Sequence, residues 1–411
     1  MKRALIAAAV LVLAGVTFAQ DGTLFDMDTV VHKPTEIVVD AKTKAKGPCA
    51  TLELVDGKFG KAVKFTFIAN ARGGFCTKWH RADASWDEAA GISFWVKGDG
   101  SASWGGLELI DQNDYALRYG YCFPIDSTEW RKITVPWCDL VPELPKGDLV
   151  DVKTGYKPSG FGNVWFGKWF YWKDYPAHSY TIDQVQLEKT IDADATDYTP
   201  AAAGLSRFLA KLEAGKPVTI VTMGDSLSDK AHWANRAQLW SEMLVAELEK
   251  KYKSKVTLVN PAIGGTQLSQ NLVLMPRWLK DHPECDLVTV WFGYNDWDGG
   301  MRGEHFEKLL RFAVDRIRRM TKGRTDVLLM TTCPANKRWH DMDELAEAVR
   351  KVAKEKKTGL ADVAAEFHKI EGDEADTALK LNYWAWDRTH LGEKGHEITR
   401  DVVLDAIEQG K

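Results

Sequence analysis

The chain has 411 residues, a formal net charge of −4 at neutral pH, six cysteines and 17 tryptophans. This length suffices for two domains of ordinary size. Positive and negative charges are mixed without a basic stripe, which disfavours nucleic acid as a partner. After the N-terminal leader, no segment approaches the uninterrupted apolar length of a membrane-spanning helix, so we expect no membrane span.

The first 19 residues have the pattern of a secretory signal peptide. A short basic start at Met1–Arg3 precedes a small, apolar stretch, and Thr17–Ala19 is a cleavage sequence. We therefore expect cleavage after Ala19 and a secreted or periplasmic protein. An oxidising compartment permits disulfides, but the four cysteines of the first half allow three pairings and the sequence does not choose among them.

Residues 20–191 read as an all-β domain. Apolar and polar side chains alternate over Val63–Phe67 and Ile92–Val96, which is typical of half-buried strands. Turn sequences separate these runs, and no long helical pattern intervenes, so we expect an antiparallel sandwich. Further predicted strands are Leu107–Ile110, Leu117–Cys122, Trp130–Pro136 and Tyr180–Glu188.

A small, polar, proline-containing stretch at 192–204 is predicted to be a linker, and the pattern then changes over 205–411. Apolar runs alternate there with amphipathic helices, such as the one in which Phe306, Leu310 and Ile317 share a face. Alternating strands and helices indicate a parallel sheet covered on both faces. The predicted strands are Val218–Met223, Val256–Val259, Leu287–Phe292 and Val327–Thr331.

Polar or glycine-rich sequences follow these strands. "GDSLS" follows the first, "NPAIGGT" the second and "GYND" the third, while "DRTH" precedes a last helix that starts around Glu393. Ligands bind outside the carboxyl ends of the strands in an open α/β sheet. The sequence therefore predicts one site, assembled from all four segments at one rim.

These four segments, in this order, resemble the SGNH (GDSL) hydrolases, and the resemblance covers roughly Leu205 to Gln409. It implies a three-layer α/β/α flavodoxin-like domain and an acyl-transfer site. Ser226 matches the family nucleophile, His390 the base, and Asp387 the acid that orients the base. The oxyanion-hole donors would be the backbone N–H groups of Ser226, at a helix start, and Gly265, with the side chain of Asn295.

Each segment also has a purely structural interpretation. Gly-Asp-Ser at a strand end is often a turn, and Asp-x-x-His before a helix is often an N-cap. The structural interpretations do not account for all four segments lying at one rim. This argument selects Ser226 over Ser228, and it assigns the orienting acid to Asp387, leaving Asp225 to brace the loop.

Aromatic residues suggest where a substrate binds. Trp384 and Trp386 lie beside the predicted base, and His232 follows the nucleophile, so all three are candidate cleft residues. The first half loosely resembles galactose-binding-like jelly rolls of carbohydrate-binding modules. Its candidate sugar platform consists of Trp165, Trp169 and Trp172, although a strand with alternating core and surface aromatics explains the same residues.

Export, a sandwich that resembles sugar-binding domains and the hydrolase-like half together favour a serine esterase acting on an acetylated polysaccharide or oligosaccharide. No metal or cofactor is expected. A lipase or lysophospholipase of the same fold is an alternative, and it would need an apolar channel or lid that the sequence does not suggest. A carbohydrate-binding protein with an inactive hydrolase domain is disfavoured, because all five predicted site residues are present.

Overall fold

The computed structural model describes residues 22–40, 42–69, 73–143, 147–169, 176–335, 339–369 and 382–410. The predicted leader at 1–19 lies outside these ranges. The six cysteines lie inside them and carry free thiols, so the disulfides that the sequence permits are not formed.

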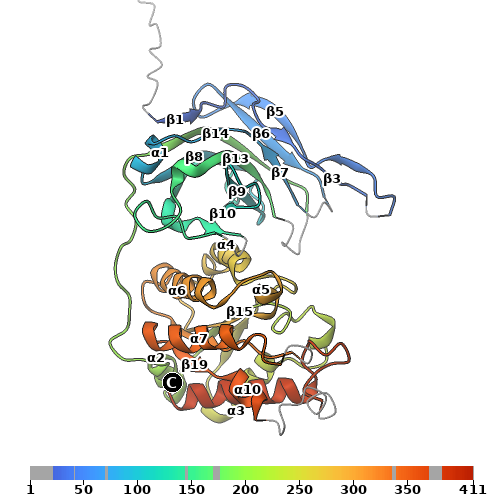
Figure 1. Ribbon diagram of the computed structural model, residues 1–411, viewed down its shortest axis with the longest axis vertical. Coiled ribbons are helices and arrows are strands. Elements are labelled where there is room, and N and C mark those ends of the chain that lie inside the picture. The colour runs from blue at the N-terminus through green and yellow to red at the C-terminus, as the bar shows by residue number, and fades with distance from the viewer. Residues whose placement is uncertain are drawn as a thin grey trace, which may run out of the picture.

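The N-terminal half is a sandwich of two antiparallel sheets, which confirms the predicted β architecture (Figure 1). Side chains from the facing sides of the sheets form one apolar core that includes Phe65, Phe94, Phe123 and Phe166. The first sheet has the order β11-β8-β14-β6-β5, with β1 also paired to β14, and the second has the order β12-β10-β9-β13-β7-β2. The first sheet consists of β1 (Thr23–Phe25), β5 (Ala50–Asp56), β6 (Lys61–Phe67), β8 (Gly91–Gly98), β11 (Arg131–Pro136) and β14 (His178–Glu188). The second consists of β2 (Lys33–Pro34), β7 (Gly74–Thr77), β9 (Trp104–Asp111), β10 (Arg118–Pro124), β12 (Val141–Pro142) and β13 (Phe161–Lys168).

Short elements connect the sandwich strands. They are the hairpin of β3 (Glu36–Val38) and β4 (Lys46–Pro48), the single-turn helix α1 (Ser85–Glu88), and the 3₁₀ turns η1 (Trp137–Asp139) and η2 (Pro158–Gly160). After β14, residues 189–204 contain no helix or strand and lead to the second half.

The second half is built on a parallel sheet of five strands in the order β16-β15-β17-β18-β19. The first strand of this half lies between the second and the third, which is the flavodoxin-like order. Its switch point lies between β15 and β17, and the segments that follow these two strands begin there. The strands are β15 (Val218–Gly224), β16 (Val256–Val259), β17 (Leu287–Trp291), β18 (Asp326–Met330) and β19 (Gly359–Ala361).

Helices cover both faces of this sheet because alternate strand residues point to opposite sides. Val221 and Met223 join one core, with α4, α6 and α7, while Val218 and Ile220 join the other, with α2, α3, α8 and α10. Figure 1 shows α4 and α6 on the side of the sheet nearer the sandwich, with α3 and α10 on the other side. The helices are α2 (Ser206–Glu213), α3 (Trp240–Tyr252), α4 (Leu268–Leu279), α5 (Tyr294–Asp298), α6 (Gly303–Met320), α7 (Asp343–Lys356), α8 (Val363–His368) and α10 (Glu393–Glu408), with the 3₁₀ turn η3 (Trp233–Asn235).

Helix α4 joins the two halves. Its buried side chains share one apolar core with Trp104, Cys122, Val141 and Trp169 of the sandwich. The Cys122 thiol donates a hydrogen bond to the Val273 carbonyl at 2.9 Å, across this contact. The second sheet of the sandwich therefore packs against the hydrolase half and does not present its outer face freely to solvent.

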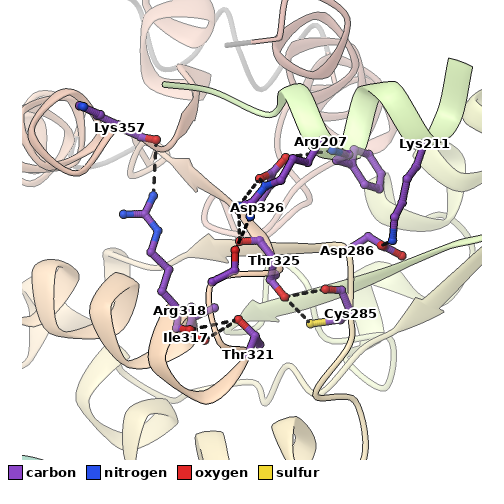
Figure 2. A network of polar contacts seen from close by, with 12 residues as sticks. Arg207, Lys211, Cys285, Asp286, Ile317, Arg318, Thr321, Thr325, Asp326 and Lys357 are labelled. Atoms are coloured by element: carbon purple, nitrogen blue, oxygen red, sulfur yellow. Dashed lines mark hydrogen bonds and ion pairs between the residues drawn. The ribbon is translucent and has the colours of Figure 1, made fainter. Parts of the chain in front are cut away.

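A polar network fastens α2 to the amino ends of the strands, at the edge away from the predicted site (Figure 2). The Asp326 carboxylate accepts hydrogen bonds from the backbone N–H of Phe208 and from Arg207 Nε, both at 2.9 Å. Asp286 accepts from the Thr219 N–H at 2.7 Å and pairs with Lys211. These bonds fix the first helix of this half to β15 and β18 and leave the opposite edge for the polar segments.

Candidate active site

Ser226 lies in a tight turn directly after β15. The N–H groups of Ser228 and Asp229 both donate to the carbonyl of Asp225, at 3.1 and 3.0 Å, and close this turn. No helix begins here, since the next elements are η3 and α3, so the expected helix start at Ser226 is wrong. Both serines of the turn are largely buried, at 8 % exposure for Ser226 and 1 % for Ser228, and the Ser226 hydroxyl contacts His390.

His390 and Asp387 lie on a loop that closes on itself before α10. The Ala385 N–H donates to the His390 carbonyl at 2.7 Å, and the Arg388 N–H donates to the Ala385 carbonyl at 2.9 Å. Within this loop, Asp387 Oδ2 lies 2.5 Å from His390 Nδ1. His390 Nε2 lies 2.9 Å from Ser226 Oγ, so the imidazole contacts both groups through its two nitrogens.

The carboxylate of Asp387 is held in its charged form. Burial opposes ionisation, but hydrogen bonds from the His390 side chain and from the backbone N–H groups of His390 and Thr389 outweigh it and lower the pKa of Asp387. An ionised carboxylate at Nδ1 fixes the tautomer in which Nε2 carries a lone pair toward the serine. The arrangement is chemically equipped to remove the Ser226 proton.

The N–H groups of Ser226 and Gly265 are the expected backbone donors to the oxyanion. Among the residues that the structure describes, no backbone carbonyl accepts from the N–H of Ser226 or Gly265. Gly265 has φ of +78°, and a Cβ there would meet no atom within 4 Å, so the left-handed backbone rather than lack of space favours glycine. Gly264 lies closer, since its added Cβ would come within 3.5 Å of Ser226 Cβ.

Asn295 approaches the site but its amide is already engaged. Asn295 Nδ2 donates to Asp225 Oδ2 at 3.2 Å and to the Thr266 carbonyl at 3.1 Å. Burial raises the pKa of Asp225 to about 6. Because the Asn295 amide already donates to these two acceptors, it has to give up one of them before it can donate to an oxyanion.

Two buried side chains that the sequence did not single out support the turn. Asn235 Nδ2 donates to the carbonyls of Ser226 and Asp229, at 2.7 Å each. Asp229 accepts from the N–H of Gly264 at 2.9 Å and so links the serine turn to the glycine loop. In the sequence, Asn235 and Asp229 are marked only as polar residues close to the nucleophile. Their hydrogen-bond partners depend on how the loops fold back over the sheet edge.

The predicted cleft aromatics fall into two groups. Trp384 is wrong as a cleft residue: it bridges to Leu391 and packs in the core, with its ring 5.1 Å from that of Phe367. Trp386 lies on the surface and is 79 % exposed. The ring of His232 stacks on His390 at 4.0 Å, and burial, followed by the nearby His390, lowers the pKa of His232.

The predicted sugar platform of the sandwich is not exposed. Trp169 is buried in the core shared with α4, and Trp165 is buried beside Phe75 and Tyr115. Both lie on the side of the second sheet against which the hydrolase half packs, so the proposal of an open platform at these two residues is wrong. Trp172 lies outside the described residues.

The described residues include one group that could hold a metal ion, at His340, Asp343 and His368. Both histidines contact the Asp343 carboxylate, at 2.9 and 3.0 Å, and the group lies at the start of α7 and the end of α8. It shares no member with the Ser226 cluster, and the expectation that the reaction needs no metal stays a prediction.

Two family comparisons match the two halves. Residues 222–398 match the GDSL-like lipase/acylhydrolase family, and residues 16–146 match the carbohydrate binding domain of family 11. The chain joins a GDSL-like hydrolase domain to a family 11 domain. The hydrolase domain makes it a carboxylic ester hydrolase. Across the described part of this hydrolase and its family 11 domain, no helix combines the length and the apolar character needed to cross a membrane.

Three of the similar solved structures each cover one of the two domains, whereas protein YXIM from Bacillus subtilis is 14 % identical, with a TM-score of 0.37, over 88 % of this chain and 88 % of its own. A lipase/acylhydrolase from Enterococcus faecalis is 17 % identical, with a TM-score of 0.39, over 47 % of this chain and 96 % of its own. A family 11 module from Clostridium thermocellum, in complex with a mixed-linked tetrasaccharide, is 16 % identical, with a TM-score of 0.32, over 41 % and 94 %. An acetyl xylan esterase is 22 % identical, with a TM-score of 0.36, over 46 % and 99 %. No curated protein matches the chain.

Proposed function

We propose that this protein is a secreted serine esterase that removes O-acetyl groups from a polysaccharide through an acyl intermediate on Ser226. The observation that carries the proposal is the position of the His390 imidazole, 2.9 Å from Ser226 Oγ and 2.5 Å from Asp387 Oδ2. The family 11 domain supports a carbohydrate as the ester-bearing partner. No metal or cofactor enters the reaction.

In the first half of the proposed reaction, His390 Nε2 takes the proton of Ser226 as its oxygen attacks the acetyl carbonyl carbon. Asp387 stabilises the imidazolium that forms. The tetrahedral intermediate collapses, the bond to the sugar oxygen breaks, and His390 returns its proton to that oxygen. The sugar leaves as a free hydroxyl, and the acetyl group remains on Ser226.

In the second half, a water molecule attacks the acyl-serine and His390 takes its proton. The Ser226–acyl bond then breaks, the serine regains a proton from His390, and acetate leaves. The N–H groups of Ser226 and Gly265 are proposed to donate to the oxyanion in both halves. Asn295 joins them by exchanging its bond to Asp225 for one to the oxyanion.

The proposed domain limits are a leader at 1–19, the sandwich at 20–191, a linker at 192–204 and the hydrolase domain at 205–411. Export is proposed because of the leader, and Edman degradation or mass spectrometry of the mature N-terminus tests cleavage after Ala19. A first mature residue other than Gln20 would contradict this limit.

The test compares wild type with Ser226→Ala on acetylated xylan, acetylated pectin, a short-chain ester and a long-chain lipid. We expect acetate release from a polysaccharide, and a loss of about 10³-fold or more in kcat for the variant. Ser228→Ala is the matched control, since Ser228 belongs to the same turn, and it should retain activity.

Activity that survives in Ser226→Ala would overturn the nucleophile assignment. Preference for the long-chain lipid would instead establish the lipase alternative. Binding to polysaccharide without hydrolysis of any ester would indicate a carbohydrate-binding protein with an inactive hydrolase domain.

A further inference from the structure

Two tryptophans form an exposed aromatic pair at the candidate active site. Between residues 205 and 410, in the part that the structure describes, Trp233 and Trp386 are the exposed large hydrophobic side chains, at 40 % and 79 %. Their rings stack with centroids 5.2 Å apart and an interplanar angle of 27°. They are far apart in sequence, so tertiary structure brings them together on the surface.

The pair lies next to the proposed reacting groups. The ring of Trp233 meets the ring of His390 edge-on, with centroids 5.8 Å apart. His390 in turn contacts Ser226 at 2.9 Å. A ligand that covers the two indoles therefore brings its substituents within reach of the serine.

Both tryptophans are held by the segments that also hold the proposed triad. Trp233 begins η3, where the Ala234 N–H donates to His232 Nδ1 at 3.4 Å, and Asn235 of the same turn binds the Ser226 carbonyl. Trp386 lies in the loop that the Ala385–His390 bond closes. The pair is thus fixed relative to Ser226 and His390.

The stacking geometry leaves one broad surface open. Trp233 covers one side of the Trp386 ring, so the exposed area of Trp386 includes its opposite face. Exposed apolar surface beside a reactive group is typical of a binding site rather than of a packed core. An indole that is 79 % exposed offers an open, flat face, which suits a rigid ring with an apolar face and a polar rim better than a flexible acyl chain.

We infer that Trp386, backed by Trp233, is a stacking platform for a pyranose ring of the glycan that carries the ester. This inference rests on the proposed function and assigns the sugar-binding surface to the hydrolase domain. The apolar C–H face of the sugar covers the indole while its hydroxyl groups stay in water, and the acetyl group extends toward Ser226. Trp233 positions Trp386 and connects the platform to His390.

The test measures kcat and KM on two kinds of acetate ester. One is the best substrate among acetylated oligosaccharides from xylan, pectin and glucomannan, and the other is ethyl acetate, which has no ring to stack. We expect Trp386→Ala to lower kcat/KM on the oligosaccharide about tenfold, mainly through KM, which corresponds to about 1.4 kcal/mol. Activity on ethyl acetate should stay within about twofold.

Trp386→Phe should restore part of the loss, because a smaller aromatic face remains. Trp79→Ala is the matched control, since Trp79 is an exposed tryptophan of the sandwich, at 66 %. This variant should change the kinetics on neither substrate. Titration calorimetry of the deacetylated oligosaccharide with Ser226→Ala, alone and combined with Trp386→Ala, measures binding without turnover, and the second change should weaken binding about tenfold.

The outcomes separate the two proposals. Equal losses on both esters, or unchanged oligosaccharide kinetics in Trp386→Ala, would overturn the platform while leaving the esterase intact. No cleavage of any acetylated oligosaccharide by wild type would overturn the proposed function and the platform with it.

Discussion

At the scale of single residues, the geometry around Ser226 depends on a few residues whose backbone conformation or pKa is unusual. Gly265 has φ of +78°, and a Cβ at this position would meet no atom within 4 Å. Its N–H is a proposed oxyanion donor, and the direction of that N–H depends on the left-handed backbone. A substitution that alters only the backbone preference can therefore separate conformational strain from steric blockage.

Gly265→Ala is expected to lower the free energy of unfolding by about 1 kcal/mol, the cost of a left-handed alanine. We expect kcat to fall about tenfold, because relaxation of the strain turns the N–H away from the oxyanion. Gly215→Ala is the matched control, since Gly215 has φ of +63° and equally open space, at the end of α2. Urea unfolding and acetate-release kinetics measure both variants, and an unchanged kcat in Gly265→Ala would refute the donor role.

The residues of the proposed triad were predicted from sequence because three short segments follow recognisable strands and a fourth precedes the last helix. The side chains that hold these residues in place could not be predicted from sequence. Asn235 and Asp229 act on backbone groups of other loops, and Trp233 meets Trp386 across the site. Such contacts depend on how loops fold over the sheet edge, and periodicity contains no information about this.

At the scale of elements, strands with alternating or continuous apolar runs were predictable, and β16 has the predicted limits of Val256–Val259. Helix α4 was not predicted. Nine of its 12 residues are buried, and Pro276 lies inside it, so it lacks the polar face and the uninterrupted pattern that mark a surface helix.

The start of α4 is tied to α5 by one titratable group. Asp296 Oδ1 accepts a hydrogen bond from the N–H of Leu268, the first residue of α4, at 2.9 Å. Burial raises the pKa of Asp296 to about 7, from 3.8. Between about pH 4 and 7 the folded protein retains a proton that the unfolded chain has released, so this contribution to stability is present at low pH and lost as pH rises through 7.

Asp296→Asn removes this titration and keeps a side-chain oxygen for the Leu268 N–H. Between pH 4 and pH 8, the free energy of unfolding of wild type should fall more than that of the variant, by on the order of 3 kcal/mol. Urea unfolding at both pH values measures the difference, and Asp298→Asn, an exposed position on the same helix, controls for the loss of one carboxyl group. A difference between variant and wild type that does not change with pH would contradict this account.

At the scale of the whole molecule, the relation between the two halves decides which aromatics are available to a ligand. The tryptophan-rich stretch that begins in β13 was a reasonable prediction of a sugar platform for an isolated sandwich. Docking of the hydrolase half buries Trp169 together with α4, which no pattern within the sandwich sequence could indicate. The exposed pair at Trp233 and Trp386 lies instead on the hydrolase half.

Because one apolar core includes residues of both halves, we expect wild type to unfold in a single calorimetric transition. Val273 is the residue through which this can be tested. It is fully buried on α4, and Gly120 of β10 lies so close that a Cβ there would come within 3.0 Å of Val273 Cγ2. A charge at this position would be buried against the second sheet.

Val273→Asp should lower the free energy of unfolding by about 3 kcal/mol or more, because a carboxylate replaces an apolar side chain in the core between the halves. The contact should loosen and the calorimetric trace should split, with the two halves melting separately. Val273→Ala is the matched control: it removes two methyl groups, costs about 2 kcal/mol and keeps a single transition at lower temperature. Two transitions in wild type would show that the halves are energetically independent, and that the shared core around α4 does not couple their folding.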